Sequence, residues 1–205
     1  MDQHRLVTDA SRYDLRALTG AALERALPEV ARLRIEVFRD WPYLYDGDLA
    51  YETRYLDGYR TSPGAVVVGA YAGDRLVGAA TGTPMEDHAE DFAAPFAASG
   101  HDLTQIFYCA ESVLEPSWRG HGIGHGFFDL REAHARALGR RYAAFCAVIR
   151  PEDHPARPAG YRPLDAFWRK RGYAPLPGVV AHFTWRDVGA SEDTPKPLQF
   201  WMRKL

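Results

Sequence analysis

The sequence from Val113 to Gly124 reads VLEPSWRGHGIG and combines a cation with three closely spaced glycines. Glycine tolerates positive φ and lets the backbone come close to a ligand, so consecutive amide N–H groups can converge on an anion. Arg119 opens the glycine-rich part and supplies a planar guanidinium, which suits a pyrophosphate. The pattern therefore predicts a phosphate-binding loop.

The residues on either side place this loop between a strand and a helix. The run from Ile106 to Leu114 is apolar and strand-like, and Pro116 closes it. Apolar residues then recur at helical spacing from Ile123 to Leu138, and Gly139 is a typical C-terminal stop. A helix that begins at the loop adds unpaired N–H groups and the positive end of its dipole to the phosphate site.

Two commoner phosphate motifs do not fit this loop. The dinucleotide fingerprint needs a further glycine three residues after Gly-x-Gly, and the P-loop needs Gly-Lys-Ser/Thr, and the stretch has neither. A glycine cluster can also be no more than a tight turn from strand to helix, and the motif alone leaves that alternative open. The order of the surrounding elements has to separate the two interpretations.

The rest of the chain predicts alternating helices and strands in an α/β order. The predicted elements are a helix at 28–39, a helix from Asp48 to about Tyr59, a hairpin of strands 65–71 and 75–81, the strand and helix around the loop, a strand at 142–149, a short helix at 163–171, and closing strands near 181–185 and 198–202. No repeat, low-complexity segment or linker divides them. We therefore expect a single domain over residues 1–205.

The loop and its flanks resemble the cofactor signature of the GNAT superfamily of acyl-CoA-dependent N-acetyltransferases, which is a Val, then a Pro, then Arg/Gln-x-x-Gly-x-Gly/Ala. The order of elements resembles the GNAT fold from about Leu6 to Leu205. This resemblance implies a mixed, mostly antiparallel central sheet with helices on both faces and a splayed pair of central strands. In that fold the slot between the splayed strands takes the pantetheine arm of the cofactor.

Position by position, the resemblance implies that acetyl-CoA is the co-substrate. Val113 and Leu114 are expected to offer backbone hydrogen bonds to the pantetheine arm. The residues expected around the pyrophosphate are Arg119, Gly120, His121, Gly122, Ile123, Gly124 and His125. His121 and His125 are spaced like a metal pair, but no carboxylate or cysteine lies nearby in the sequence, so we expect no metal site.

A second family landmark departs from the usual pattern. The sequence FWRKRGY at 167–173 resembles Phe-Tyr-Glu-Lys-x-Gly-Phe, with Trp168 where the family often has the tyrosine that protonates the leaving thiolate. An indole N–H has no proton to give up near neutral pH. Tyr161 stands where the family often has a cofactor-contacting asparagine. Either the thiolate leaves without that acid, or another group such as Tyr161 supplies the proton.

Acetylation of an amine also needs a base. Glu111 is the only acidic residue in the apolar part of strand 106–114, and an ionisable group there is paired, protonated or used. Glu111 is the first candidate base, with structural pairing to an arginine as an equal alternative. Strand alternation places it on the face of Phe107 and Cys109 unless a bulge re-aims it. Tyr108 is the second candidate, with packing as its alternative role.

Two segments are candidates for the acceptor site. Residues 84–102 carry five acidic side chains and no lysine or arginine, which favours a cationic amine, although such a patch is more often a solvated face. Tyr43, Tyr45, Asp46 and Asp48 follow the first helix, where the GNAT fold commonly places acceptor contacts. We expect the amine of a small molecule or a peptide to bind between the two segments.

Charge and composition exclude several classes of partner. A net charge of −2 and a pI near 6.4 do not indicate a nucleic-acid-binding surface. We interpret the four arginines near the helix after the loop as a solvated face; they are Arg131, Arg136, Arg140 and Arg141. No apolar run is long enough to span a bilayer, and the first residues do not open a signal peptide. We expect a protein that binds neither nucleic acid nor membranes.

Cysteine usage and the closing strand suggest the compartment and the assembly. Cys109 and Cys146 both lie in apolar runs, which favours buried thiols in the reducing cytoplasm. An exposed closing strand at 198–202 would allow two copies to pair as a homodimer.

The sequence thus predicts an N-acetyltransferase that moves an acetyl group from acetyl-CoA directly to a primary amine. Direct transfer is expected because no nucleophile with its base is visible. Trp168 leaves an alternative open, a non-catalytic acyl-CoA-binding or regulatory domain. A nucleotide-binding protein that uses the same loop is the weakest interpretation, because both nucleotide motifs fail.

Overall fold

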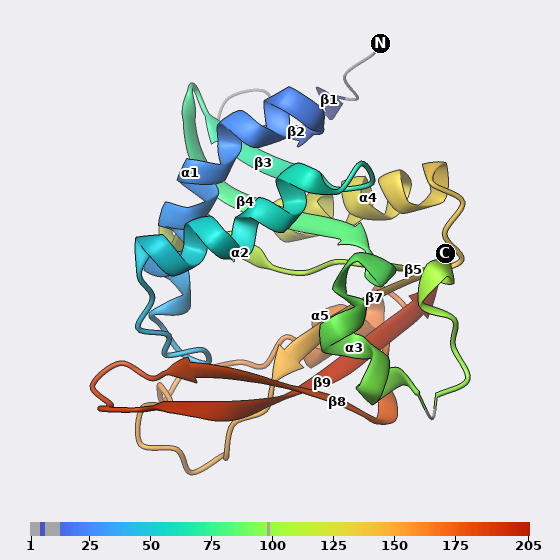
Figure 1. The fold of residues 1–205 in the computed structure, drawn as a ribbon. Coiled ribbons are helices and arrows are strands. Elements are labelled where there is room, and N and C mark those ends of the chain that lie inside the picture. Colours follow the sequence, from blue (N-terminus) through green and yellow to red (C-terminus); the bar gives the residue numbers. More distant parts are fainter. Residues whose placement is uncertain (1–4, 7–12, 98) are drawn as a thin grey trace.

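The computed structural model describes residues 5–6, 13–97 and 99–205 (Figure 1). The strands of this part form one nine-stranded sheet in the order β1-β2-β3-β4-β5-β7-β9-β8, and β6 pairs with β4 beside β5. All neighbouring strands are antiparallel except β5 and β7, which run parallel. The predicted mixed, mostly antiparallel sheet is confirmed.

The predicted elements follow one another in the predicted order, and the structure adds β1, β2 and α3 and divides the predicted strand 106–114 into β5 and β6. The strands are β1 (Arg5–Leu6), β2 (Asp14–Leu18), β3 (Val66–Ala72), β4 (Arg75–Pro84), β5 (Ile106–Tyr108), β6 (Ser112–Leu114), β7 (Tyr142–Val148), β8 (Ala174–Arg186) and β9 (Asp193–Lys204). The α-helices are α1 (Gly20–Phe38), α2 (Leu49–Thr61), α3 (Ala89–Phe96), α4 (Ile123–Ala137) and α5 (Asp165–Lys170), and 3-10 turns occupy Met85–His88, Leu103–Gln105 and Pro116–Trp118.

Helices cover both faces of the sheet. Figure 1 shows α1, α2 and α3 in front of the strands and α4 behind them. The alternation along β3 produces these two layers, because Val66 and Val68 pack into the core on the α4 face, whereas Val67 packs into the core under α1 and α2. The predicted two-sided arrangement of helices is therefore confirmed.

The first two helices differ in how well their starts were predicted. α1 begins at Gly20 rather than at Pro28, and Pro28 lies inside it. Leu23 and Ala26 are buried, so packing against the sheet extends the helix by two turns at the cost of one backbone hydrogen bond at the proline. The start of α2 agrees with the prediction, because the Asp48 carboxylate accepts a hydrogen bond from the Tyr51 N–H over 2.9 Å.

The closing strand is not an edge. β9 lies between β7 and β8, with Phe145 of β7 opposite Trp201 and Ala181 of β8 opposite Leu198. The expectation that residues 198–202 form an exposed edge for pairing between copies is therefore wrong. An alternating pattern is the same for an edge strand and for a central strand of an antiparallel sheet, so sequence alternation does not separate the two.

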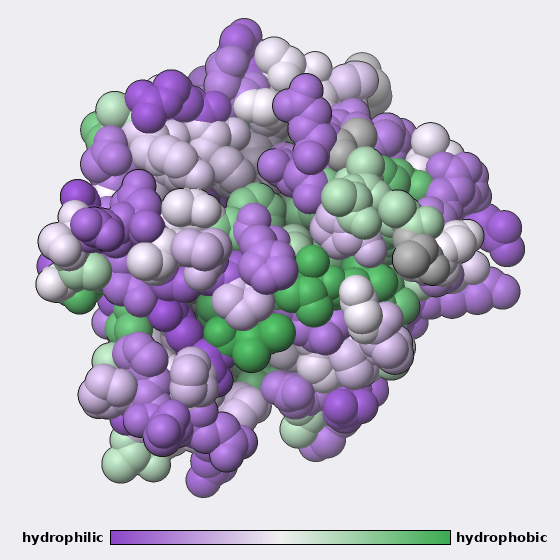
Figure 2. All heavy atoms as spheres, turned by 60° about the horizontal axis from the view of Figure 1, so that its bottom comes forward, coloured by the Kyte–Doolittle hydropathy of each residue, from purple (hydrophilic) through white to green (hydrophobic). Residues whose placement is uncertain are grey.

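The surface is mostly polar. Figure 2 shows one face on which hydrophilic residues predominate and hydrophobic residues gather near the centre. The large hydrophobic side chains with the greatest exposure, Leu49 and Leu164, are 60% and 55% exposed. None of the helices in the described ranges is both long and apolar enough to cross a membrane.

Candidate active site

A β-bulge interrupts the strand that leads into the glycine-rich loop. Ala110 N–H donates to the Thr81 carbonyl over 3.1 Å, and Thr81 N–H donates to the Glu111 carbonyl over 3.0 Å, so two residues of one strand oppose a single residue of β4. Accordingly, β5 and β6 pair with β4 in registers that differ by one residue. The extra residue moves every following side chain to the opposite face of the sheet.

The bulge decides where Glu111 lies. Phe107 and Cys109 pack into the core under α4, but the Glu111 carboxylate lies on the α1 and α2 side. There its Oε1 is 2.7 Å from Nη1 of Arg34, and its Oε2 accepts a hydrogen bond from the Tyr55 hydroxyl over 3.2 Å. The prediction that Glu111 shares a face with Phe107 and Cys109 is therefore wrong, because alternation holds only in an uninterrupted strand.

The strands separate immediately after the bulge. β5 pairs with β7 up to Tyr108 and Ala144, and Cys109 N–H adds one bond to the Ala144 carbonyl over 2.7 Å. Beyond this point β6 pairs with β4, whereas β7 continues beside β9. Ser112 is exposed although it lies in the middle of the sheet. The predicted splayed strand pair, with a slot between β6 and β7, is confirmed.

The backbone groups that line the slot belong to alternate residues of β6. The Glu111 carbonyl and the Glu115 N–H both bond to β4. Hydrogen bonding alternates along an antiparallel ladder, so Val113 also directs its N–H and carbonyl toward β4. Ser112 and Leu114 direct theirs toward the slot. The backbone contacts expected from Val113 and Leu114 thus shift to Ser112 and Leu114.

The loop has the backbone shape that an anion site needs. Gly120 and Gly122 have φ of +83° and +81°, and α4 begins directly after Gly122. The N–H groups of residues 120–124 have no hydrogen-bond partner within the described part of the chain. Arg119 is exposed, and its Nε donates to the Leu114 carbonyl over 3.4 Å. A helix N-terminus, free N–H groups and a guanidinium therefore share one side of the slot.

The two histidines of the loop are exposed and have ordinary neighbours. The His121 carbonyl accepts a hydrogen bond from the Tyr13 hydroxyl over 2.9 Å. The His125 ring packs on Phe167 at 4.8 Å between centroids and lies 3.2 Å from Nη1 of Arg171. Among the described residues, no three His, Cys, Asp or Glu side chains are arranged to hold a metal ion.

Arg131 lies inside the protein, so its interpretation as part of a solvated face is wrong. It is 1% exposed and donates to the carbonyls of Thr81, Glu111 and Phe127 over 3.0, 3.1 and 3.2 Å. Its Nη2 also donates to Oγ of Ser112 over 2.9 Å. The Thr81 and Glu111 carbonyls also accept hydrogen bonds from N–H groups within the bulge, so this guanidinium is a second donor to both oxygens.

A buried ion cluster lies on the other side of the bulge. Arg34 of α1 forms ion pairs with Glu52 of α2 and with Glu111, and all three side chains are buried. Burial opposes the charge of Arg34, but the neighbouring carboxylates raise its pKa well above the usual value. One guanidinium faces two carboxylates, so the cluster has an excess negative charge when both are ionised. Arg34 and Glu52 are not predicted as site residues from the sequence, although Arg34 follows buried Val30 by one helical turn.

The tyrosines near this cluster are neutral phenols. Burial raises the pKa of Tyr55 well above its usual value, and Glu111 raises it further. Burial also raises the pKa of Tyr108 well above its usual value, and the Tyr108 hydroxyl lies 3.3 Å from Sγ of Cys146. A phenol with a raised pKa is a poor base near neutral pH. These contacts and the raised pKa fit the alternative role of Tyr108, which is packing, and its role as a base stays a prediction.

The two predicted acceptor segments face the same stretch of β8. Phe92 of α3 packs on Phe183 at 5.9 Å, and Tyr43 packs on Trp185 at 6.0 Å, both between ring centroids. Phe183 and Trp185 are two residues apart on one strand and so share a face. The structure thus brings both segments to one side of the sheet, the side on which Glu111 lies.

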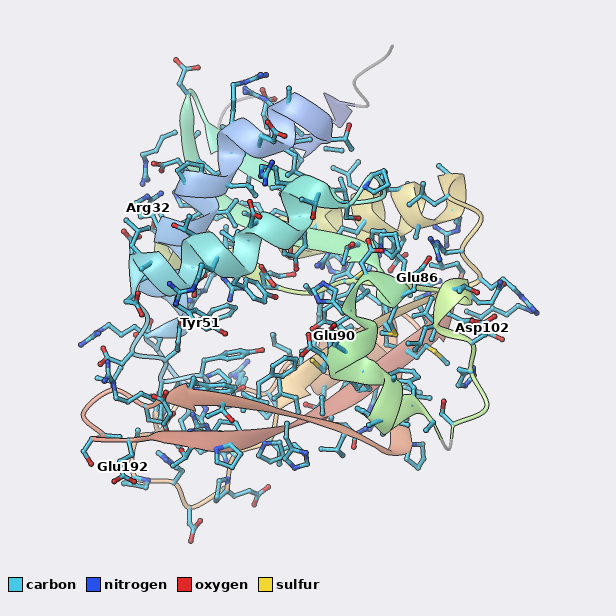
Figure 3. All side chains as sticks on the ribbon, viewed as in Figure 1. Arg32, Tyr51, Glu86, Glu90, Asp102 and Glu192 are labelled. Atoms are coloured by element: carbon cyan, nitrogen blue, oxygen red, sulfur yellow. The ribbon has the colours of Figure 1, made fainter. Side chains whose placement is uncertain are left out.

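Only part of the acidic segment is free to meet a ligand. Glu86 forms an ion pair with Arg140 at 2.8 Å, and the Asp102 side chain caps a 3-10 turn. Glu90 is exposed, and Figure 3 shows it on α3 across from Tyr51, which lies on the side of α2 that faces β8. Glu90 therefore remains available to a cation that approaches between α2 and α3.

Arg150 fastens the loop between α1 and α2 to the β8–β9 hairpin. Its guanidinium donates to the carbonyls of Pro42 and Tyr43 over 2.9 and 2.6 Å and to both oxygens of Asp187 over 2.8 Å. The Trp185 indole N–H adds a bond to the Tyr43 carbonyl over 3.1 Å. These contacts hold Tyr43 against β8 on the Glu111 side of the sheet.

The Arg150–Asp187 pair predicts a pH-dependent contribution to stability. Burial alone would raise the pKa of Asp187, but the hydrogen bonds and charge of Arg150 lower it. A lowered folded-state pKa gives stability that is present at neutral pH and is lost as the pH falls through that pKa. We expect the loss of unfolding free energy in Asp187→Asn to be largest above about pH 5 and to shrink below about pH 4.

Urea unfolding across this pH range measures the effect of Asp187→Asn. The control is Asp193→Asn, at an exposed position of the same hairpin, and it is expected to leave stability unchanged at every pH. If Asp187→Asn lowers the free energy of unfolding by the same amount at neutral and at acidic pH, the prediction is contradicted.

Tyr161 and Trp168 lie in different surroundings. The Tyr161 ring packs edge-on against Trp41, in the loop after α1, at 5.9 Å between centroids. Trp168 packs between Phe145 and Trp201 at 4.9 and 5.2 Å. Tyr161 thus packs against the loop that follows α1, and Trp168 is part of an aromatic cluster on the α4 and α5 side.

The comparisons with known proteins give no match by sequence: neither a protein family nor a curated protein matches this chain. Solved structures do match. A ribosomal-protein-alanine N-acetyltransferase from Brucella melitensis superposes with a TM-score of 0.59 at 16% identity, over 93% of this chain and 99% of its own. A candidate acetyltransferase of the GNAT family from Desulfovibrio desulfuricans gives 0.55 at 13%, over 94% and 98%. This chain has the GNAT fold.

Another structure with the GNAT fold includes the cofactor. A candidate acetyltransferase from Salmonella typhimurium was solved with acetyl-CoA and superposes with a TM-score of 0.55 at 11% identity, over 93% of this chain and 94% of its own. The resemblance drawn from the loop and from the element order is confirmed at the level of the fold.

Proposed function

We propose that this protein transfers an acetyl group from acetyl-CoA directly to a primary amine. The observation that carries the proposal is the glycine-rich loop, with its free N–H groups, placed at the end of an open slot in a GNAT fold. Donor and acceptor are assigned to opposite sides of the sheet, because the loop lies on the α4 side and Glu111 lies on the α1 side. The bulge connects the two sides, because Glu111 and Ser112 follow one another there and lie on opposite faces of the sheet.

The residues at the slot fit acetyl-CoA. The N–H groups of residues 120–124, the α4 dipole and Arg119 together suit a pyrophosphate. The backbone groups of Ser112 and Leu114 that face the slot suit the amides of the pantetheine arm, which would lie along β6 like an added strand; a carbonyl has two lone pairs, so that of Leu114 can accept a second bond beside the one from Arg119. Bound acetyl-CoA supplies an activated acyl group as a thioester.

Glu111 is the proposed base. Its carboxylate points to the acceptor side, and Arg34 and the Tyr55 hydroxyl hold it in one orientation. A base in this place accepts a proton from the ammonium group, so that the nitrogen lone pair becomes free to attack the thioester carbon. Holding the base in place lowers the entropic cost of reaching the reactive geometry.

The acceptor is proposed to be a cationic amine of a small molecule or a peptide. Two carboxylates, Glu52 and Glu111, share the single guanidinium of Arg34, and with the exposed Glu90 they favour a positively charged ligand on this side of the sheet. Tyr43 and other aromatic side chains nearby offer faces for the apolar part of such a ligand.

Titration calorimetry with CoA tests the cofactor site. We expect the double variant Arg119→Ala/Gly122→Ala to bind CoA about tenfold to a hundredfold more weakly, because it loses a phosphate-binding cation and strains a residue at positive φ. The matched control is Arg136→Ala/Gly139→Ala, which changes an exposed arginine and a positive-φ glycine at the other end of α4. Equal CoA affinity in both double variants contradicts the proposed site.

Release of free thiol from acetyl-CoA across a panel of amines tests the reaction itself. Turnover with at least one amine supports acetyl transfer. Tight CoA binding without turnover of any amine supports a non-catalytic acyl-CoA-binding domain, which Trp168 in place of the usual tyrosine favours.

A further inference from the structure

The slot contains a hydroxyl group whose proton has no acceptor in the described part of the chain. Oγ of Ser112 accepts a hydrogen bond from Nη2 of Arg131 over 2.9 Å, and Ser112 is exposed. A serine hydroxyl has one proton to donate and two lone pairs to accept. Because Arg131 occupies a lone pair, the Ser112 O–H proton is directed away from Arg131 and is free for a ligand.

Arg131 carries a buried positive charge without a carboxylate partner among the described residues. Apart from Ser112, only backbone carbonyls accept its hydrogen bonds. A buried charge of this kind is costly unless it is fully hydrogen-bonded, and it raises the electrostatic potential around it more than an exposed charge does. The α4 side of the slot is therefore suited to stabilise negative charge that develops on a ligand, as an oxyanion hole does.

The bulge places two adjacent side chains on opposite faces at the same point of the slot. Glu111 faces Arg34 and α1, whereas Ser112 faces Arg131 and α4. The glycine-rich loop also begins α4, so the arm of a donor held by the loop enters the slot on the Ser112 side. In this arrangement the departing sulfur would lie beside Ser112, and the attacking nitrogen would lie beside Glu111.

We propose that Ser112 is a catalytic residue for the departure of the thiolate and that Arg131 is its positioning residue; this inference rests on the proposed acetyl transfer. The Ser112 O–H donates a hydrogen bond to the sulfur as negative charge develops on it, and Arg131 makes the hydroxyl a stronger donor. Ser112 and Arg131 together supply the hydrogen-bond donor for the leaving thiolate. Trp168 does not supply it, because its side chain packs between Phe145 and Trp201 and has no titratable proton.

The reaction balances with these two side chains. One ammonium proton passes to Glu111, and the freed nitrogen lone pair forms the C–N bond at the thioester carbon. The C–S bond breaks, and its electron pair stays on sulfur, which Ser112 stabilises. The nitrogen still carries one proton in excess, and this proton passes to the sulfur through the Ser112 hydroxyl. The products are the amide and the CoA thiol, and Glu111 returns its proton to water.

Binding of CoA and desulfo-CoA tests the inference without turnover. Desulfo-CoA lacks the thiol, so the ratio of the two affinities reports on the sulfur alone. We expect the protein to prefer CoA increasingly as the pH rises from about 7 to about 9, where a thiol ionises. In Ser112→Ala this preference at the upper pH is expected to fall about tenfold or more, with desulfo-CoA affinity unchanged.

The matched control is Ser117→Ala, an exposed serine in the 3-10 turn that follows β6, which is expected to keep the full pH-dependent preference. The same pH-dependent preference in Ser112→Ala and in the unchanged protein overturns the inference. Failure of the unchanged protein to bind desulfo-CoA contradicts the proposed cofactor site instead, so the two failures are distinguishable.

Arg131→Lys gives a second, independent readout. Lysine keeps the charge but loses the planar fork that reaches Ser112 and the bulge carbonyls together. We expect a lower kcat with an unchanged KM for acetyl-CoA and a reduced pH-dependent preference for CoA over desulfo-CoA. A purely structural role for Arg131 would leave that preference intact in the folded variant, and such a result overturns the positioning role.

Discussion

Replacing Arg34 by methionine is expected to lower the free energy of unfolding by about 3–5 kcal/mol. Arg34 holds two buried carboxylates, Glu52 and Glu111, which are 0% and 7% exposed. Without the guanidinium, both charges remain in a low-dielectric interior with no cation to balance them. Chemical denaturation with urea at neutral pH measures the loss.

The same experiment has a matched control two residues away on α1. Arg32 is partly exposed and pairs with Glu29 and Glu36 at 2.9 and 2.7 Å, so Arg32→Met is expected to cost less than about 1 kcal/mol. A deficit as small as that of Arg32→Met contradicts the prediction.

The second large effect concerns activity. Glu111→Gln is expected to lower kcat/KM by about 10²–10⁴ and to abolish the acidic limb of the pH–rate profile, because glutamine keeps the shape of the side chain but takes up no proton. Arg34 keeps its ion pair with Glu52, and glutamine can still accept the Tyr55 hydrogen bond, so the variant is expected to stay folded. Steady-state kinetics from about pH 5 to about pH 9 measures both effects.

Glu52→Gln separates catalysis from a disturbance of the ion cluster. Glu52 shares Arg34 with Glu111 but lies on α2 rather than at the bulge, so the same chemical change there is expected to keep the acidic limb. An acidic limb that persists in Glu111→Gln removes this residue as the base. Its role is then the structural pairing with Arg34 that the sequence left as an equal alternative.

Much of the fold was predictable because the signals are local. The glycines at 120 and 122 adopt positive φ, Gly139 follows the end of α4, and Asp48 caps α2, and each of these depends on neighbours within a few residues. The hairpin of β3 and β4 and the strand β7 were predicted for the same reason. The loop and the order of elements together pointed to the GNAT fold.

The candidate site was less predictable, because one inserted residue reverses strand alternation. The sequence indicates Glu111 as a candidate base, but the predicted face of the sheet is wrong. The bulge that changes this face depends on two hydrogen bonds with Thr81 of β4, which is distant in sequence. The prediction of an exposed Arg131 is wrong, although Arg131 follows buried Phe127 by one helical turn, a spacing that indicates the core face. Ser112 was not singled out, because only the separation of β6 from β7 exposes it.

Contacts between neighbours along the chain are enough to shape a phosphate loop, cap a helix or set a strand period, and the sequence of this protein determines those features by itself. Contacts between distant segments placed Glu111 and Ser112 on opposite faces, buried Arg34 and Arg131 beside them, and made β8 rather than β9 the edge. The physical reason is that burial, ion pairing and strand register depend on partners that folding brings together. Local sequence periodicity does not determine which residues those partners are.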